Sequence, residues 1–304
     1  MSIKQRLYDY DEDHRFNEDY HRIHDFLHDV NDMTHAANLN FTWGRWAWMI
    51  SRPVDDERKR SKIGIWEDGD KVVAVVTHEL GYGHVYMVVN PDYGDLKEEM
   101  ITYAKEHLRA EDGMLRIIID DRDDRFQAIA LSEGFVPIEK HERLSIKYMA
   151  EAPEVNVPKG YSLVSMDEEW DYEKYSDCLY LGFNHDGEPR LDEEDDMDEK
   201  KTMLSSPYLD KRLMIVAKDE AGNYVSHAGL WHLKGDEMCY VEPVCTVPEH
   251  RKKGLGRACL ALAMRRAYEN KARYSVVGNT LQFYHNQRFL PKMRQTWWEL
   301  RNQK

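Results

Sequence analysis

The chain has 304 residues, and its 42 lysines and arginines against 56 aspartates and glutamates give a formal net charge of −14. Hydrophobic residues make up 42% and charged residues 32% of the chain, which excludes a disordered polymer and is typical of folded globular proteins. The longest apolar runs, such as residues 72–76, fall far short of the ~20 residues of a membrane helix, so we expect no membrane partner.

Two features of the sequence bear on cellular location. Residues 1–6 are polar and lack the apolar stretch of a secretory signal. The four cysteines form no C-x-x-C pair and are too sparse for a disulfide framework: Cys178, Cys239, Cys245 and Cys259. We therefore expect a cytoplasmic protein with reduced thiols.

Charge is distributed unevenly along the chain. Residues 1–150 have a net charge of −10, residues 151–250 a net charge of −15, and residues 251–304 a net charge of +11. Because the charge near a cleft matters more for binding than the total, the last segment predicts a local anion site.

The elements predicted along the chain repeat once. Residues 150–160 contain two prolines and a glycine without periodicity, which predicts a linker at the midpoint. In the first half, a strand is expected at residues 3–8, followed by a polar helix that ends at about residue 31. Further strands and helices are expected at residues 71–78, 85–90, 95–108, 115–119 and 126–135. Their counterparts in the second half are expected at residues 161–164, 170–181, 213–218, 224–232, 241–247, 254–270, 274–277 and 280–289. The repetition predicts two copies of one α/β domain fused in tandem.

The most informative segment, residues 241–258, has the pattern of a strand, a tight glycine turn and a helix. Gly254 and Gly256 allow successive backbone N–H groups to face one point, and the helix N-terminus adds positive potential. Four basic side chains surround this turn: Arg251, Lys252, Lys253 and Arg257. The combination is suited to holding a diphosphate.

The arginine-x-x-glycine-x-glycine turn, followed by Ala258 and a helix, resembles the acetyl-CoA loop of GNAT-family N-acetyltransferases. In that family a tyrosine commonly lies five residues before the phenylalanine of a glycine-phenylalanine pair, and Tyr284 has this position relative to Phe289. Arg288 replaces the usual glycine, and the interval from Asn279 to Tyr284 is about two residues shorter than the usual pattern.

Together with the repeat, these motifs make the chain similar to a tandem GNAT protein. The resemblance implies an α/β fold of two GNAT-like domains, each a mixed central sheet flanked by helices. Residues 161–304 would form the catalytic domain, and residues 1–149 a degenerate copy that binds no cofactor. In that copy Gly94 is followed by carboxylates where the second half has its basic turn, and Ala130 takes the place of Tyr284 relative to Phe135.

For the second domain, the resemblance implies that the pantetheine arm of acetyl-CoA lies along a strand edge, where an N–H near Cys245 or Thr246 polarises the thioester carbonyl. Pro243 cannot donate a ladder hydrogen bond and favours the bulge that opens this strand from its neighbour. The implied cofactor contacts are Val244, Cys245, Thr246, Val247, Arg251, Lys252, Lys253, Gly254, Leu255, Gly256, Arg257, Ala258 and Asn279.

The implied reaction is direct attack of an amine in a ternary complex, without a covalent enzyme intermediate. Since an amine of pKa ~10 is mostly protonated at neutral pH, a base is needed, and Glu242 is the candidate. Tyr284 would return a proton to the leaving thiolate. The −15 segment, with its acidic run at residues 192–196, favours a small cationic amine as acceptor.

Several alternatives remain open at this stage. Glu242 can be a salt-bridged strand residue, Tyr284 a packed core residue, and Cys245 a small buried residue in preference to an acyl-carrying nucleophile. The chain can also be a non-catalytic acyl-CoA sensor or interaction module. Nucleic acid is not expected as a partner, because aromatic stacking motifs are absent beside the basic residues. Both a monomer and a homodimer are compatible with the sequence.

Histidines recur at seven-residue spacing in the first half: His14, His21, His28 and His35, with His24 added. Without partnering cysteines or a ligand motif, this pattern predicts a polar helix face, and we expect no metal. The aromatic run at residues 41–48 predicts core packing.

Overall fold

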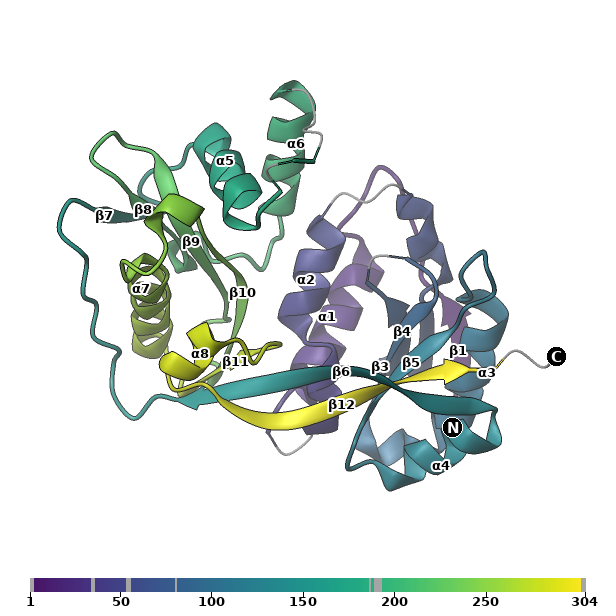
Figure 1. The fold of residues 1–304 in the computed structure, drawn as a ribbon. Helices are drawn as coiled ribbons and strands as arrows, with labels where there is room; N and C mark the ends of the chain where they lie inside the picture. The colour runs from purple at the N-terminus through teal and green to yellow at the C-terminus, as the bar shows by residue number, and fades with distance from the viewer. Residues whose placement is uncertain are drawn as a thin grey trace. The chain divides into compact units, whose positions relative to one another are not determined.

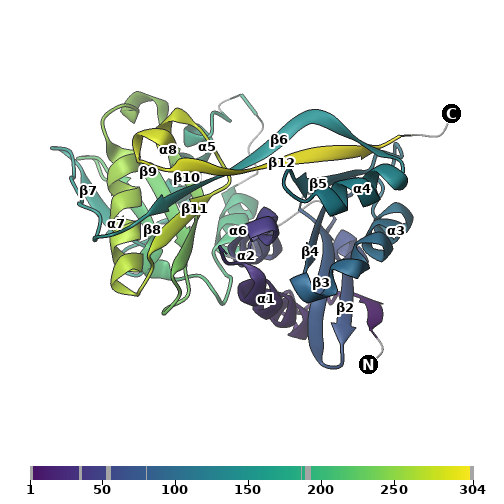
Figure 2. The ribbon, with the colours of Figure 1, turned by 90° about the horizontal axis from the view of Figure 1, so that it is seen from below.

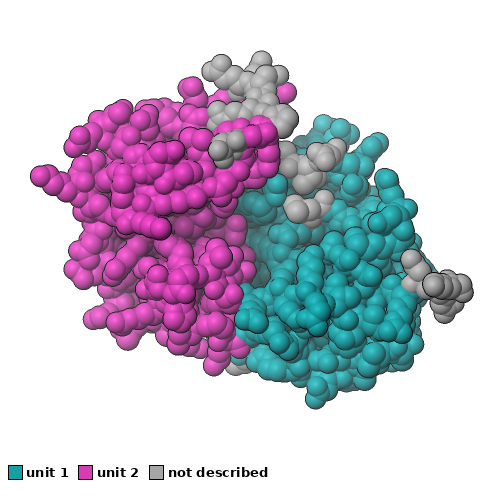
Figure 3. Space-filling view, in the orientation of Figure 1, with its two compact units in different colours: residues 1–143, 293–304 teal, residues 144–292 magenta. Residues whose placement is uncertain are grey.

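The computed structural model describes residues 3–33, 36–52, 56–79, 81–185, 187–188 and 193–301. The chain forms two compact units, coloured separately in Figure 3. Unit 1 contains residues 1–143 and 293–304, and unit 2 contains residues 144–292. Within the described part of the chain, no helix is long and apolar enough to cross a membrane.

Unit 1 has a mixed sheet flanked by helices, as predicted (Figure 1). Its elements are β1 (Lys4–Leu7), α1 (Glu18–Val30), α2 (Trp43–Ser51), β2 (Gly64–Asp68), β3 (Lys71–His78), β4 (His84–Val89), α3 (Lys97–His107), β5 (Arg116–Asp120), α4 (Asp124–Ser132) and β6 (Phe135–Tyr148). The strand order is β1-β2-β3-β4-β5, and only β4 and β5 pair in parallel within this run.

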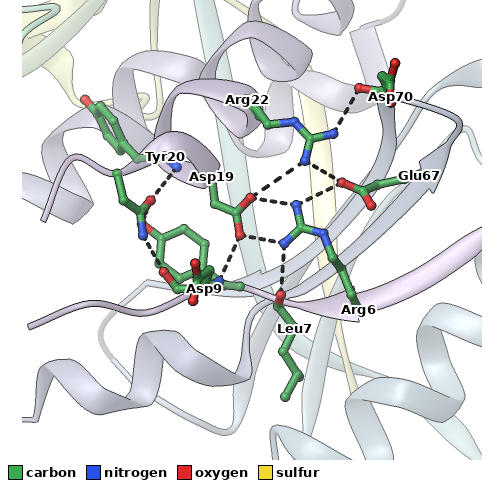
Figure 4. A network of polar contacts seen from close by, with 10 residues as sticks. Arg6, Leu7, Asp9, Asp19, Tyr20, Arg22, Glu67 and Asp70 are labelled. Atoms are coloured by element: carbon green, nitrogen blue, oxygen red, sulfur yellow. Dashed lines mark hydrogen bonds and ion pairs between the residues drawn. The ribbon is translucent and has the colours of Figure 1, made fainter. Parts of the chain in front are cut away.

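Helix α1 begins after Asn17, whose side chain accepts a hydrogen bond from the Tyr20 N–H at 3.0 Å. Its first turn carries Asp19, which pairs with Arg6 of β1 at 2.6 Å (Figure 4). Arg6 also reaches Glu67 of β2 at 2.8 Å. Because these side chains are mostly buried, the network fixes β1 and α1 on the edge of the sheet.

Unit 2 repeats the architecture. Its elements are β7 (Ser162–Ser165), α5 (Tyr172–Gly182), α6 (Glu193–Met203), β8 (Met214–Lys218), β9 (Tyr224–Trp231), β10 (Met238–Thr246), α7 (Leu255–Glu269), β11 (Tyr274–Val277) and α8 (Gln282–Asn286). The strand order is β11-β10-β9-β8-β7, with β10 and β11 parallel. Side chains of β10 alternate between the two faces of the sheet, so Cys245 packs on Gly182 of α5 and Thr246 lies beside Gly256 of α7. Helices α5 and α7 therefore cover opposite faces.

The last strand of each half completes the sheet of the other half. In unit 2, residues 145–148 of β6 pair antiparallel with β11. In unit 1, residues 295–299 of β12 (Leu290–Leu300) pair antiparallel with β5. The two long strands are seen from two directions in Figures 1 and 2.

This exchange moves the limits of the units away from those expected from the sequence. The units divide after residues 143 and 292, whereas the sequence suggested limits at 149 and 161. Residues 150–160 contain no helix or strand, yet they lie wholly within unit 2. The sequence could not show this, because β6 has the same pattern whichever neighbouring strand it pairs with.

Candidate functional site

The candidate site is built on the edge of β10. Strands β10 and β11 pair only from Met238 to Tyr240. Beyond Tyr240 the register of β10 against β9 shifts between Val241 and Val244, while β10 continues to Thr246. The bulge predicted around Pro243 is therefore present, and the final residues of β10 have no strand partner on the β11 side among the described residues.

The hydrogen-bond pattern shows which backbone groups face this open edge. The Val247 N–H donates to the Val225 carbonyl at 3.0 Å, so the pairing of β9 and β10 is hydrogen-bonded at every second residue from there. By this alternation Cys245 bonds to β9, whereas Val244 and Thr246 direct their N–H and carbonyl groups away from it. Of the two N–H groups suggested from the sequence, Thr246 has the suitable direction.

The glycine turn lies immediately after this edge. Gly254 has a φ of 90° and Lys252 a φ of 62°, both in the left-handed region. Among the described residues no side chain caps the start of α7, so the first N–H groups of the helix are directed toward a potential anion. A Cβ at Gly256 would lie 3.2 Å from the Thr246 hydroxyl and 3.3 Å from the Phe283 ring, so only glycine fits without displacement.

The basic residues of the turn are used in different ways. The Arg251 guanidinium donates to the Thr246 carbonyl at 2.9 Å, the Gly182 carbonyl at 3.0 Å and the Asn184 amide oxygen at 2.6 Å. It therefore ties β10 to the end of α5 instead of extending freely toward a phosphate. Lys253 donates to the Tyr161 hydroxyl at 3.2 Å. The side chains of Lys252 and Arg257 are exposed.

Tyr284 lies on α8 and is only 8% exposed. Its ring packs against Phe283 and Phe289, with centroids 5.0 and 5.7 Å away. Burial, followed by the nearby charges of Glu242 and Cys245, raises the pKa of its phenol well above the usual value. The group thus holds its proton at neutral pH.

Two further candidates have defined positions. Glu242 lies half-buried within the bulge of β10 and is close enough to influence Tyr284 electrostatically. The Asn279 side-chain oxygen accepts a hydrogen bond from the Leu281 N–H at 2.8 Å, so it stabilises the turn before α8. Its carbonyl accepts a bond from the Ser145 hydroxyl of β6 at 2.6 Å.

Residues 172–290 match the model of the acetyltransferase (GNAT) family. The second half of the chain is a GNAT domain. No curated protein matched the sequence.

Solved structures extend this similarity over the whole chain. A tandem GNAT protein from the clavulanic acid biosynthesis pathway is 15% identical, with a TM-score of 0.61 and 100% of both chains covered. A GCN5-related N-acetyltransferase from Sphaerobacter thermophilus is 15% identical, with a TM-score of 0.58, covering 99% of this chain and 97% of that one. N-myristoyltransferase from Saccharomyces cerevisiae, solved with myristoyl-CoA, is 11% identical, with a TM-score of 0.55, covering 100% and 80%. The predicted tandem GNAT fold is confirmed, and the family match of residues 172–290 supports acyl transfer from an acyl-CoA as the general activity.

The face of the second GNAT domain under α5 holds polar groups that the sequence did not indicate. The Tyr175 hydroxyl and His227 Nε2 are buried without a hydrogen-bond partner among the described residues, and their rings lie 5.0 Å apart. The His227 Nδ1–H donates a hydrogen bond to the Ile215 carbonyl at 3.0 Å, and burial lowers the pKa of the imidazole to about 4. Neither residue stands in a recognisable motif, so no sequence signal could have found them.

Cys245 occupies the same face and is buried. Its sulfur lies 3.9 Å from the sulfur of Cys178 and 3.5 Å from the Cys178 carbonyl. His227 of β9 is its register partner, but no hydrogen bond between His227 and Cys245 occurs in the described part of the chain, so Cys245 has the environment of a packed strand residue.

The equivalent edge in the first GNAT domain is occupied by the chain itself. Strands β4 and β5 pair only at the start of β4, and a cavity of about 360 Å³ follows. The Asn40 and Asn38 amides donate to the carbonyls of Met87 at 3.3 Å and Val89 at 3.1 Å. In the repeat, Met87 corresponds to Val244 and Val89 to Thr246. In the first domain, asparagine side chains therefore bind the backbone carbonyls at the strand edge that has no strand partner in the second domain.

The remaining predictions for the first half have mixed outcomes. The aromatic run is core, as predicted, with Phe41, Trp43 and Trp46 fully buried. The polar helix face is wrong for His24, which is buried against Trp43; burial lowers its pKa to about 4. His14 precedes α1, His35 lies outside the described residues, and no cluster of three potential metal ligands occurs in the described ranges.

Proposed function

We propose that this chain is an acetyl-CoA-dependent N-acetyltransferase that transfers an acetyl group to a primary amine of a small cationic acceptor. The observation that carries the proposal is the open edge of β10 directly before the glycine turn of α7, with the Tyr284 phenol nearby. The acyl group would pass directly to the amine in a ternary complex.

The residues present fit acetyl-CoA, which would supply the acetyl group as an activated thioester. The backbone groups of Val244 and the N–H of Thr246 would pair with the amides of the pantetheine arm, as a neighbouring strand would, while the Thr246 carbonyl already accepts a hydrogen bond from Arg251. The N–H groups between Lys252 and Gly256 would bind the diphosphate at the positive end of α7. A side chain at Gly256 would require Thr246 or Phe283 to shift by a few tenths of an ångström.

Proton transfer would involve two groups of the second domain. Glu242, within the bulge, would accept a proton from the acceptor amine, directly or through a water. Tyr284 would donate its proton to the departing sulfur. Its raised pKa makes it a weaker acid but keeps it in the donor form, which is the form that a developing thiolate requires.

The first domain would bind no cofactor. Its β4 edge already has partners in Asn38 and Asn40, and buried Ala130 takes the place of Tyr284. Its role would be structural, as the source of the strand that completes the second sheet.

The preference for a cationic acceptor follows from the acidic composition of residues 151–250. Part of the acidic run at 192–196 lies outside the described residues. In the described part, Asp196 pairs with Lys200 of α6 at 3.2 Å. Acceptor choice is best tested directly with a panel of polyamines, aminoglycosides and amino acids.

The test is a CoA-thiol release assay over that panel, with the wild type, Tyr284→Phe and Tyr268→Phe as the matched control. Tyr268 lies on α7, where its hydroxyl donates to the Ala150 carbonyl. We expect release with at least one amine and about a hundredfold lower kcat for Tyr284→Phe alone. Acyl-CoA binding without release from any amine would instead favour the sensor. If neither acetyl-CoA nor CoA raises the melting temperature at millimolar concentration, the cofactor site itself is wrong.

A further inference from the structure

The cavity of about 360 Å³ in unit 1 lies in the gap between β4 and β5, beyond the point where the two strands stop pairing. Met87 and Val89 line it from β4, and Ile118 and Ile119 line it from β5. Because successive residues of a strand point to opposite faces, Ile118 and Ile119 extend the cavity to both faces of the sheet. Its volume is within the range of small-molecule sites. The walls in the gap itself are therefore apolar.

One end of the cavity carries buried hydrogen-bond acceptors. The segment η1 (Ala36–Asn40) packs on β4 and β5, and its Asn40 lines the cavity with only 8% of the residue exposed. The Asn40 amide nitrogen donates to the Met87 carbonyl, and Oδ1 of the same amide is buried without a hydrogen-bond partner among the described residues. Asp120, at the end of β5, also lines the cavity and is 5% exposed; its carboxylate pairs with Arg122 at 2.7 Å. A primary ammonium, with three N–H donors, suits these acceptors.

The orientation of the Asn40 amide is fixed by its neighbours. Turning it by 180° would place its oxygen against the Met87 carbonyl, so that two acceptors would face each other. The Asn40 backbone carbonyl accepts a hydrogen bond from Arg45 at 3.2 Å, and the next residue, Phe41, packs on Tyr86 with ring centroids 5.1 Å apart. Tyr86 alternates with Met87, which belongs to the core cluster under α3. Segment η1 therefore lies on the face of the sheet opposite α3.

The other end of the cavity carries two cations. Lys97, the first residue of α3, and Arg125, in the first turn of α4, both line the cavity. These helices pack on the core cluster that contains Ile119. Since Asp120 follows Ile119 along β5, its side chain points to the opposite face. The cations and the buried acceptors thus lie on different faces of the sheet, with the apolar gap between them.

Both cations keep N–H donors beyond those used by their acid partners. Lys97 pairs with Asp123, whose other oxygen caps α4 by accepting from the Phe126 N–H at 2.9 Å. Arg125 pairs with Asp95, which is exposed, so water screens that pair. An ammonium has three donors and a guanidinium five, so a further carboxylate can be bound at this end.

We propose that this cavity binds a linear ω-amino acid, with its ammonium at Asn40 and Asp120 and its carboxylate at Lys97 and Arg125. The apolar walls of the gap suit a methylene chain. Because the two ends lie on opposite faces of the sheet, several methylenes must separate the charges, and an α-amino acid would reach only one end. The proposal goes beyond the proposed function, since it gives the first domain a ligand other than the cofactor in addition to its structural role.

The test is isothermal titration calorimetry of the full chain with a series of aminoalkanoates from β-alanine to 8-aminooctanoate. We expect the affinity to rise about threefold to fourfold with each added methylene until the chain spans the gap, and to fall beyond that length. Hexylamine lacks the carboxylate and hexanoate lacks the ammonium, so each should bind about tenfold more weakly than 6-aminohexanoate. Equal binding of hexylamine and 6-aminohexanoate by the wild type would overturn the proposal.

Two variants test the two ends separately. Lys97→Met keeps an apolar chain against the Phe126 ring, 4.9 Å from the Lys97 ammonium, and removes the charge. It should bind hexylamine as the wild type does and 6-aminohexanoate no more tightly than hexylamine. Asp120→Asn should lose the preference for 6-aminohexanoate over hexanoate. Each readout is a ratio of dissociation constants within one variant, so a modest loss of stability does not imitate it. If Asp120→Asn fails to fold, Lys97→Met alone decides.

Lys105→Met is the matched control. Lys105 lies on the same helix, pairs with Glu133 and lies 5.8 Å from the Phe135 ring centroid, but it does not line the cavity. An equal effect of Lys105→Met and Lys97→Met would overturn the site.

The second domain is also proposed to take a primary amine, so the same variants enter the CoA-thiol release assay. Lost binding with unchanged thiol release in Lys97→Met would support a site in unit 1. If Lys97→Met binds 6-aminohexanoate as tightly as the wild type does, the ligand does not lie in this cavity and the proposal is overturned. A failure of thiol release with every amine would contradict the proposed function and leave the binding ratios that support this cavity standing.

Discussion

The strand exchange predicts which fragment of the chain can fold alone. Residues 144–292 include the part of β6 that pairs with β11, whereas residues 161–292 lack it. We expect the longer fragment to unfold cooperatively and the shorter one to be unfolded or aggregated. The two fragments differ only in residues 144–160.

The magnitude follows from the burial of that segment. Leu144, Ile146 and Met149 are 7%, 3% and 4% exposed. At about 1.5–3 kcal/mol for each buried side chain, their removal costs about 5–9 kcal/mol. This is comparable with the whole stability of a domain, about 5–15 kcal/mol, and the loss of a paired strand adds to it.

Far-UV circular dichroism in urea, with size-exclusion chromatography, would measure both fragments. A third fragment, residues 161–304, adds the remainder of β12, whose Trp297 and Trp298 are buried in unit 1, and should aggregate more. In the intact chain, Ile146→Ala should lower the free energy of unfolding by about 2–5 kcal/mol. The reasoning is refuted if residues 161–292 unfold with the same urea midpoint as residues 144–292.

Three further predictions concern the turn, the first domain and pH. Gly254→Ala should destabilise the chain by about 1–2 kcal/mol, because its φ is 90°, and should also weaken CoA binding; unchanged thermal melts and titrations would contradict this. Asn38→Ala leaves the buried Val89 carbonyl unpaired and should cost about 1–3 kcal/mol in urea melts without changing the dissociation constant of acetyl-CoA; weaker acetyl-CoA binding would show that the first domain takes part. Burial lowers the pKa of His24, His78 and His227 to about 4. Because the unfolded state therefore binds more protons than the folded state below pH 6.5, the free energy of unfolding should fall from pH 6.5 toward pH 4. The expected decrease is up to about 1.4 kcal/mol per histidine and pH unit. A urea midpoint that stays constant from pH 7 to pH 5 would contradict the neutral buried state of these histidines.

The order of elements could be predicted because each local signal had one structural meaning. The turn before α7 requires a residue with a left-handed backbone conformation, and Gly254 has a φ of 90° at this position. The bulge around Pro243 was equally local. The strand with which β6 pairs could not be predicted from local signals. Strand pairing depends on which sheet edge is open after folding, and no residue in β6 specifies that edge.

The same limit applies to the site. Arg251 has the charge that a phosphate would attract, and the sequence could not show that backbone carbonyls and Asn184 already occupy its guanidinium.

The strand that the first half of the chain contributes to the second sheet also supports the proposed site. Ser145 of β6 donates to the Asn279 carbonyl at 2.6 Å, and Asn279 in turn accepts from the Leu281 N–H just before α8. Tyr284 is the third residue of α8, which begins at Gln282. A strand encoded in the first half thus holds the segment that precedes the proposed proton donor.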